Sequence, residues 1–128
     1  MVIDSSALLS IYLKEPRHEA CFEKIARSTI AAIGAPTLLE VTMVLSARTG
    51  RDTRGEIARS LRRLQIQVIP FTGEHFEVAA EAFHRYGKGR HPAALNFGDC
   101  MSYAVAALSG LPLLYIGNDF AQTDIKAA

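Results

Sequence analysis

The sequence predicts an α/β fold with a central parallel sheet and helices on both of its faces. Short apolar segments alternate along the chain with longer segments whose apolar residues recur every three or four positions, as they do in helices. Parallel strands need a crossover connection, and this alternation supplies a helix for each of them. The chain has 128 residues, 49% of them hydrophobic, which is enough for one core. We therefore expect a single domain spanning residues 1–128.

The amino-terminal part is predicted to hold a strand, two helices and a second strand. Val2-Ile3 precedes the polar turn Asp4-Ser5-Ser6, so it is expected to be a buried strand that leads into a helix. Pro16 ends that helix, a second helix follows, and the apolar run Thr29 to Ile33 is expected to be the next strand. The apolar residues at helical spacing are Leu8, Leu9, Tyr12 and Leu13 in the first helix, and Phe22, Ile25 and Ala26 in the second.

The middle of the chain is predicted to hold two helices and a third strand. Pro36 suits the first turn of a helix, which is expected to continue from Thr37 to Ala47 and to end at Gly50. Another helix is expected around Ile57, Leu61 and Leu64, which recur at helical spacing. The next strand is expected at Gln67 to Pro70.

The carboxyl-terminal part is predicted to hold two helices and a fourth strand. Phe76 and Phe83 share one helical face, which we interpret as core. Glycines then bracket a loop, a further apolar helix ends at Gly110, and Leu113 to Ile116 is expected to be a strand. The bracketing glycines are Gly87, Gly89 and Gly98, and the helix carries Met101, Ala104, Val105 and Leu108.

Composition narrows the classes of protein to which the chain can belong. The net charge of +1 lacks the strong basic excess of a protein that coats DNA, so any nucleic-acid surface has to be local. The two cysteines, Cys21 and Cys100, are far apart and form neither a disulfide framework nor a zinc motif. No uncharged apolar run approaches the ~20 residues that a membrane span needs. We expect a soluble, cytoplasmic protein.

Four acidic residues are candidates for a functional site, and two of them lie beyond the carboxyl ends of strands, where a parallel sheet binds ligands. Asp4 follows the first strand and Asp119 follows the last, while Glu40 and Asp99 lie near the starts of helices. Each position also has a purely structural interpretation: Asp4 and Asp99 fit helix N-caps, and Asp119 fits an ordinary loop.

Glu40 is the exception, because its helical neighbours Pro36, Met43, Val44 and Ala47 are apolar. A glutamate on such a face is rarely buried unless it is paired or coordinated. Carboxylates that converge on one pocket repel one another, and a hard divalent cation relieves that repulsion. The sequence therefore predicts a site for Mg²⁺ or Mn²⁺.

Four segments carry a resemblance to a known family. They are Val2-Ile3-Asp4-Ser5-Ser6-Ala7-Leu8, Leu38-Leu39-Glu40-Val41, Leu95-Asn96-Phe97-Gly98-Asp99-Cys100 and Leu113-Leu114-Tyr115-Ile116-Gly117-Asn118-Asp119-Phe120. In order and spacing they resemble the motifs of PIN-domain proteins, in particular the VapC-type ribonuclease toxins of type II toxin-antitoxin systems. The resemblance spans nearly the whole chain.

The resemblance implies a PIN-like fold and a set of site residues. Asp4, Glu40 and Asp99 would form a catalytic metal site, with Asn118 or, as we favour because of its charge, Asp119 as the fourth member. Ser6 would orient Asp4 or touch a phosphate, although an ordinary serine at a helix start fits equally well. A VapB-type antitoxin and a homodimer are implied as partners.

The chemistry implied is metal-assisted hydrolysis of RNA phosphodiester bonds. A bound cation lowers the pKa of water and stabilises charge on the leaving oxygen. Glu40 is a candidate proton acceptor as well as a ligand.

Two basic segments are candidates for RNA binding. Lys88 and Arg90 lie in a glycine-rich loop before Asp99 and could hold the RNA backbone while Tyr86 stacks on an unpaired base. A solvated helix end explains the same residues. For the arginine cluster of residues 51–63 we favour a solvated or partner-binding face.

Other functions share parts of this pattern. A Mg²⁺-binding receiver-like signalling domain also has acids at its strand ends, but it usually has paired acids after the first strand and a lysine after the last, and neither is evident here. A PIN-like scaffold that binds RNA without cutting it is a second alternative, and a DNA nuclease or a metal-dependent phosphatase is a third.

Overall fold

A computed structural model describes residues 1–128, and its centre is a four-stranded parallel sheet of order β3-β2-β1-β4. The strands are only two to four residues long. They are β1 (Val2–Ile3), β2 (Ala31–Gly34), β3 (Ile66–Ile69) and β4 (Leu113–Leu114). The predicted α/β class is confirmed, and so are all four strands, with shifts of at most two residues at their ends.

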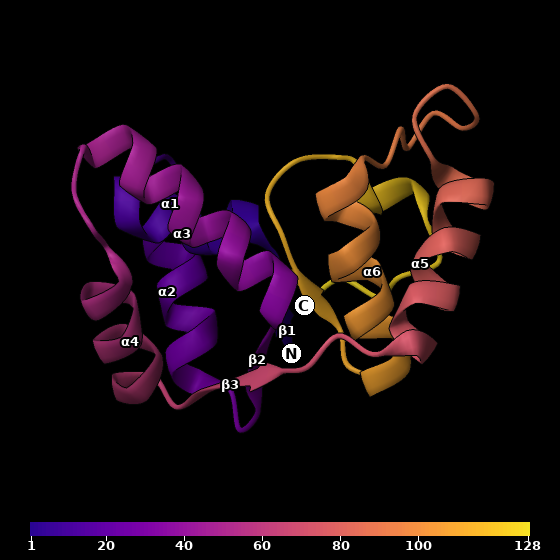
Figure 1. Ribbon diagram of the computed structural model, residues 1–128. Helices are drawn as coiled ribbons and strands as arrows, with labels where there is room; N and C mark the ends of the chain where they lie inside the picture. The colour runs from indigo at the N-terminus through magenta and orange to yellow at the C-terminus, as the bar shows by residue number, and fades with distance from the viewer.

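Six helices cover the two faces of the sheet. Figure 1 shows α1 to α4 on one side of the sheet and α5 with α6 on the other. No helix is long and apolar enough to cross a membrane. The helices are α1 (Ser5–Leu13), α2 (His18–Arg27), α3 (Ala35–Thr49), α4 (Arg54–Arg63), α5 (Gly73–Tyr86) and α6 (Phe97–Ser109), and a 3₁₀ turn, η1 (Phe120–Gln122), follows β4.

Alternation along the short strands divides the core into two parts. Val2 and Leu113 point toward α5 and α6, whereas Ile3 and Leu114 point toward α1 to α4, and all four side chains are buried. Parallel sheets are normally covered on both faces in this way.

The predicted helix ends depend on proline and glycine, and the structure confirms them. Pro36 lies in the first turn of α3, and Gly50 and Gly110 end α3 and α6 in the left-handed conformation, with φ of 67° and 63°. At α6 the N-cap is Asn96 rather than Asp99, so the structural interpretation of Asp99 as an N-cap is wrong.

Phe76 and Phe83 do not belong to the core, which contradicts their interpretation from the sequence. Their side chains are 60% and 42% exposed, because α5 packs on α6 through a neighbouring face that carries Ala79, Ala82 and Tyr86. The face of Glu40 is also only partly covered, since Met43 is largely exposed. Both helices thus leave apolar side chains on the surface.

Candidate active site

Asp4 is the most buried of the four predicted acids. It follows β1, caps the amino end of α1, and its backbone N–H donates to Leu114 O at 2.9 Å, so β4 fixes its position. The residue as a whole is only 3% exposed. The Oδ2 atom accepts from the Ser6 backbone N–H and from the Ser6 hydroxyl, whereas the buried Oδ1 atom has no partner.

Ser6 links Asp4 to the segment that follows β4. Its hydroxyl donates to Asp4 Oδ2 at 2.6 Å and accepts from the Ile116 backbone N–H at 3.0 Å. Of the two roles considered for Ser6, orienting Asp4 is the one that these bonds support. They also explain why β4 ends at Leu114, since the Ile116 N–H is used by a side chain instead of a strand.

Glu40 reaches the site from the second turn of α3. Burial and the negative charge of Asp4 raise the pKa of Glu40 above its usual range, and a hydrogen bond with Ser5 opposes this shift. Its carboxylate lies against Gly98 of α6, where an added Cβ would come within 2.8 Å of Oε2. Glu40 is therefore held between α1 and α6.

Asp99 is the third residue of α6 and forms a capping box with Asn96. Its Oδ2 accepts from the Asn96 N–H at 2.8 Å, and its own N–H donates to Asn96 Oδ1 at 3.0 Å. Burial raises the pKa of Asp99 to about 6 despite the Asn96 N–H, and the charges of Asp4, Asp119 and Glu40 contribute in that order.

Asp119 and Asn118 lie in the exposed segment between β4 and η1. The charge of Asp119 acts on Asp99, which brings Asp119 within electrostatic range of the group. Asn118 uses its backbone carbonyl to accept from Ala121 N–H at 3.1 Å. Between the two, only Asp119 adds a negative charge to the site.

The four acids form one negative group without a cationic partner. None of the five ion pairs in the structure involves any of them. Their oxygen donors, and above all the unpartnered Oδ1 of Asp4, fit a hard divalent cation. The side chains do not yet converge, because no three of the His, Cys, Asp and Glu side chains are arranged to hold one ion.

Comparison with known proteins identifies the family. A family model described as PIN domain matches residues 1–126. The chain belongs to the PIN-domain family. Ribonuclease VapC36 of Mycobacterium tuberculosis is 43% identical over 127 residues, 98% of this chain and 91% of that protein. Ribonuclease VapC of Mycolicibacterium smegmatis is 39% identical over 127 residues, 99% of this chain and 98% of that protein. This PIN domain therefore falls within the VapC group, and the predicted family is confirmed.

Solved structures show the same fold. Mycobacterium tuberculosis VapC20, described as a Sarcin-Ricin loop cleaving toxin, has a TM-score of 0.76 at 21% identity, covering 99% of this chain and 97% of its own. A toxin-antitoxin complex from Klebsiella pneumoniae contains a chain with a TM-score of 0.69 at 24% identity, covering 96% and 92%. The predicted PIN-like architecture is confirmed.

In this PIN domain the basic loop leads into α6, the helix that carries Asp99. Lys88 and Arg90 are exposed, and Figure 1 shows their loop projecting beyond the ends of α5 and α6. Arg90 stands over the Phe83 ring at 5.6 Å, and the Lys88 N–H donates to Leu95 O at 3.0 Å. Tyr86 is only 9% exposed, and its hydroxyl accepts from Arg85 at 2.6 Å. The predicted stacking of Tyr86 on an RNA base is wrong, because the ring is part of the core.

Two residues of the site were not anticipated from the sequence. Ser5 supports Glu40, and Gly98 makes room for its carboxylate. Ser5 lies in the first segment that resembles the family and Gly98 in the third, so both were within the motifs but had no role assigned. Their roles depend on how α1, α3 and α6 pack, which the spacing of residues along the chain does not reveal.

Proposed function

We propose that this PIN domain, residues 1–128, is a metal-dependent endoribonuclease and the toxic component of a type II toxin-antitoxin system. The observation that carries the proposal is the uncompensated acidic group around Asp4 Oδ1, in which Asp99 has a pKa of about 6. Perturbed pKa values and missing partners of this kind are characteristic of catalytic sites. The catalytic and metal-binding residues are Asp4, Glu40, Asp99 and Asp119.

RNA as the substrate is supported by the relatives. The curated VapC proteins at 38–43% identity are named ribonucleases, and they align with nearly the whole chain. The VapC20 toxin, which shares the fold, is described as cleaving the Sarcin-Ricin loop.

Mg²⁺ or Mn²⁺ is the proposed cofactor, held by the four acidic residues. When bound, such a cation activates water and neutralises charge on the phosphate. Ser6 holds the Asp4 carboxylate in place through Oδ2 and leaves Oδ1 free for coordination. Glu40 is the candidate that accepts the proton of the attacking water.

The exposed cations of the loop between α5 and α6 are proposed to bind the RNA backbone. Lys88 and Arg90 form no ion pair with this chain, so both charges are available to phosphates. A VapB-type antitoxin would neutralise the enzyme, and the toxin-antitoxin complex from Klebsiella pneumoniae supports a partner of that kind. The two free, buried cysteines fit a reducing cytoplasm.

A homodimer is proposed from an apolar surface that α3, α5 and the start of α6 share. Two adjoining grooves of about 450 and 370 Å³ meet at Phe97, which is 78% exposed, and at Met101. Contiguous exposed apolar patches mark interaction sites, and the same patch on two copies can form a two-fold contact. Phe97→Asp should convert a dimer to a monomer in light scattering. The other exposed members are Leu39, Met43, Phe76 and Phe83.

Cleavage assays with purified protein test the activity. We expect single-stranded or structured RNA to be cut with Mg²⁺ or Mn²⁺, DNA to remain intact, and chelator to stop the reaction. Asp4→Asn and Asp99→Asn should abolish cleavage while leaving the fold intact. Binding of RNA without any cutting would favour the scaffold alternative, and full activity of either variant would contradict the site.

A further inference from the structure

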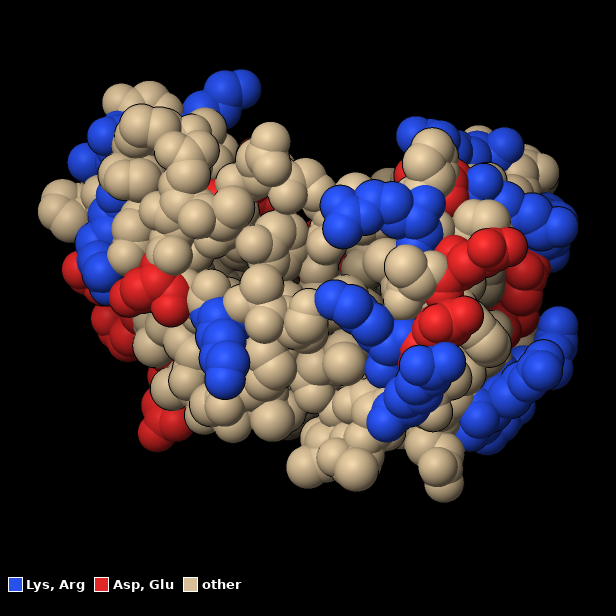
Figure 2. Space-filling model, turned by 180° about the vertical axis from the view of Figure 1, so that it is seen from behind, with Lys and Arg blue, Asp and Glu red and all other residues tan.

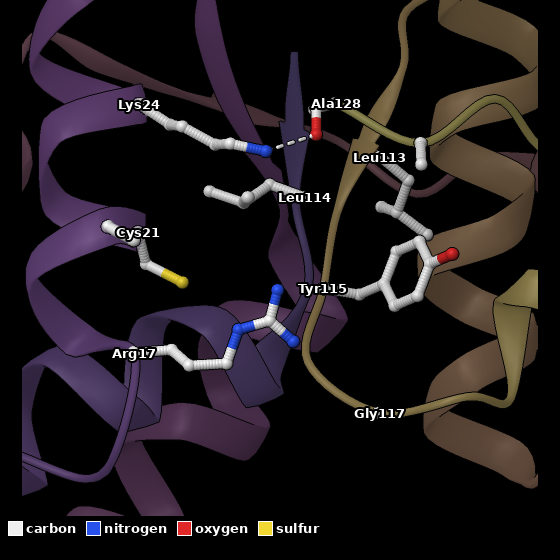
Figure 3. Close-up of a pocket in the computed structure, with 10 residues that line it drawn as sticks. Arg17, Cys21, Lys24, Leu113, Leu114, Tyr115, Gly117 and Ala128 are labelled. Carbon is white, nitrogen blue, oxygen red and sulfur yellow. Dashed lines mark hydrogen bonds between the residues drawn. The ribbon is translucent and has the colours of Figure 1, made fainter.

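A separate cavity of about 190 Å³ lies between α2 and the β4 edge of the sheet, where Leu113 pairs with the last residues of the chain. Figure 3 shows the guanidinium of Arg17 and the ammonium of Lys24 extending into it from α2, with Tyr115 on the opposite side. Lys24 belongs to α2, and Arg17 is the N-cap residue that precedes this helix. Cys21 and Gly117 complete the surroundings.

Neither cation of this cavity is paired with an acidic side chain. Lys24 donates one hydrogen bond, to Ala128 O at 2.6 Å, and Arg17 donates none. A guanidinium has five N–H donors and an ammonium has three, so most of their hydrogen-bonding capacity faces open space.

The sheet edge contributes a backbone donor to the same cavity. Leu113 uses its outer N–H and C=O to pair with Lys126 and Ala128, and Tyr115, two residues later, faces the same edge. The Tyr115 N–H has no acceptor in the structure. One unpaired amide and two cationic side chains form an anion-binding arrangement.

The cavity also borders the active site. Tyr115 and Gly117 line the cavity, and Ile116 between them donates its N–H to the Ser6 hydroxyl that holds Asp4. One backbone segment therefore has the cations on one side and the catalytic acids on the other.

We propose that Arg17, Lys24 and the Tyr115 N–H form a binding site for a backbone phosphate of the RNA substrate, adjacent to the phosphate that is cut. The proposal rests on the proposed ribonuclease function. Arg17 adopts a left-handed backbone conformation, with φ of 74°, which is rare for residues other than glycine. Arg17 has this conformation at the N-cap of α2, and its side chain lines the cavity.

Binding of a single-stranded RNA oligonucleotide across a salt series, in an Asp99→Asn background that does not cut, tests the site. Arg17→Gln and Lys24→Gln should each weaken binding several-fold and lower the slope of log K against log salt by about 0.7. Arg27→Gln, on the same helix but paired with Glu23, is the matched control and should change neither. Glutamine keeps the backbone strain at position 17 unchanged, and melting temperatures verify folding.

Two results would overturn the proposal. One is an RNA affinity and salt slope for the Arg17→Gln/Lys24→Gln double variant that equal those of Arg27→Gln. The other is a double variant that binds RNA normally but loses affinity for polyglutamate, which would assign the cavity to an acidic protein segment. Cleavage of the same oligonucleotide by the chain with Asp99 intact is measured in parallel. If this protein does not cleave the oligonucleotide, the ribonuclease function is contradicted. The binding data decide the phosphate site in either case.

Discussion

The carboxylate of Glu40 lies beside the Cα of Gly98, in the place that a side chain at position 98 would need. A Cβ at this point would lie 2.8 Å from Oε2 and 3.2 Å from Oε1 of Glu40. The two residues belong to α3 and α6, on opposite faces of the sheet, so this contact joins the two halves of the site. Gly98 immediately precedes Asp99, and its missing side chain therefore sets how closely Glu40 approaches that acid.

Gly98→Ala should impair catalysis without unfolding the protein. The added methyl group displaces the Glu40 carboxylate, and a misplacement of about 1 Å at a catalytic group can cost ~100-fold in rate. Alanine is a better helix former than glycine, so the melting temperature should not fall. Cleavage rate and thermal unfolding of the purified variant are the measurements. Gly55→Ala is the control, because its Cβ would meet only the flexible end of Arg59 at 3.7 Å.

Divalent cations should stabilise the folded protein. A ligand that binds only the folded state adds ~2.7 kcal/mol at a hundredfold excess over its Kd. The unpartnered Oδ1 of Asp4 and the mutual repulsion of the acids give Mg²⁺ or Mn²⁺ a reason to bind here. Thermal unfolding across a titration should show a rise in the parent and none in Asp4→Asn. A melting temperature that stays constant in the parent would argue against a metal site.

Without metal, Asp99 should make stability depend on pH. Its pKa is about 6 in the folded state and ~3.9 when unfolded. Between these values the folded state holds more protons, so the free energy of unfolding falls as pH rises from about 4 to about 6. In chelator, Asp99→Asn should therefore be more stable than the parent at pH 7.5, and the difference should shrink as pH drops toward 4. Denaturant unfolding at several pH values measures it, and a parent that is the more stable protein at pH 7.5 would contradict the assignment.

Helix boundaries and the order of elements could be predicted because local chemistry sets them. Pro36, Gly50 and Gly110 act within a turn or two of their own positions, and each bounds a helix as expected. The candidate acids could be proposed for a different reason. The topology of a parallel sheet brings the ends of its strands and the starts of the following helices together.

Features that depend on packing between distant segments could not be predicted in this way. Helical spacing shows that Phe76 and Phe83 share a face, but it does not reveal that α6 covers the neighbouring face that carries Ala79. The contact of Glu40 with Gly98 and the cavity beside Lys24 likewise depend on how helices from different parts of the chain meet the sheet.

Asp119 should contribute less than the other acids, and Asn118 less still. Asp119 is exposed, so solvent weakens its effect on the site, whereas Asp4 is almost fully buried. We expect Asp119→Asn to reduce cleavage partially and to raise the Mg²⁺ concentration needed for half-maximal rate. Asn118→Ala should change neither quantity, because the contact of Asn118 in the structure uses its backbone carbonyl. The reverse ranking in a metal titration of the two variants would make Asn118 the fourth member of the site.

Ser6→Ala should act through Asp4 and not through the RNA. The hydroxyl donates to Asp4 Oδ2 and accepts from the Ile116 N–H, so its removal leaves that N–H without an acceptor and loosens the carboxylate. Losing a partner of a buried polar group costs about 1–3 kcal/mol, which denaturant unfolding resolves.

The same variant distinguishes the two roles considered for Ser6. A positioning role predicts a lower cleavage rate at saturating RNA and a weaker stabilisation by Mg²⁺, because both depend on where the Asp4 carboxylate lies. RNA affinity, measured in the Asp99→Asn background, should stay at the parent value. Ser6→Thr keeps the hydroxyl and should restore most of the rate and stability. If Ser6→Ala instead weakened RNA binding and left both the free energy of unfolding and the response to Mg²⁺ unchanged, the hydroxyl would have to contact a phosphate, and its bonds to Asp4 and Ile116 would not explain its function.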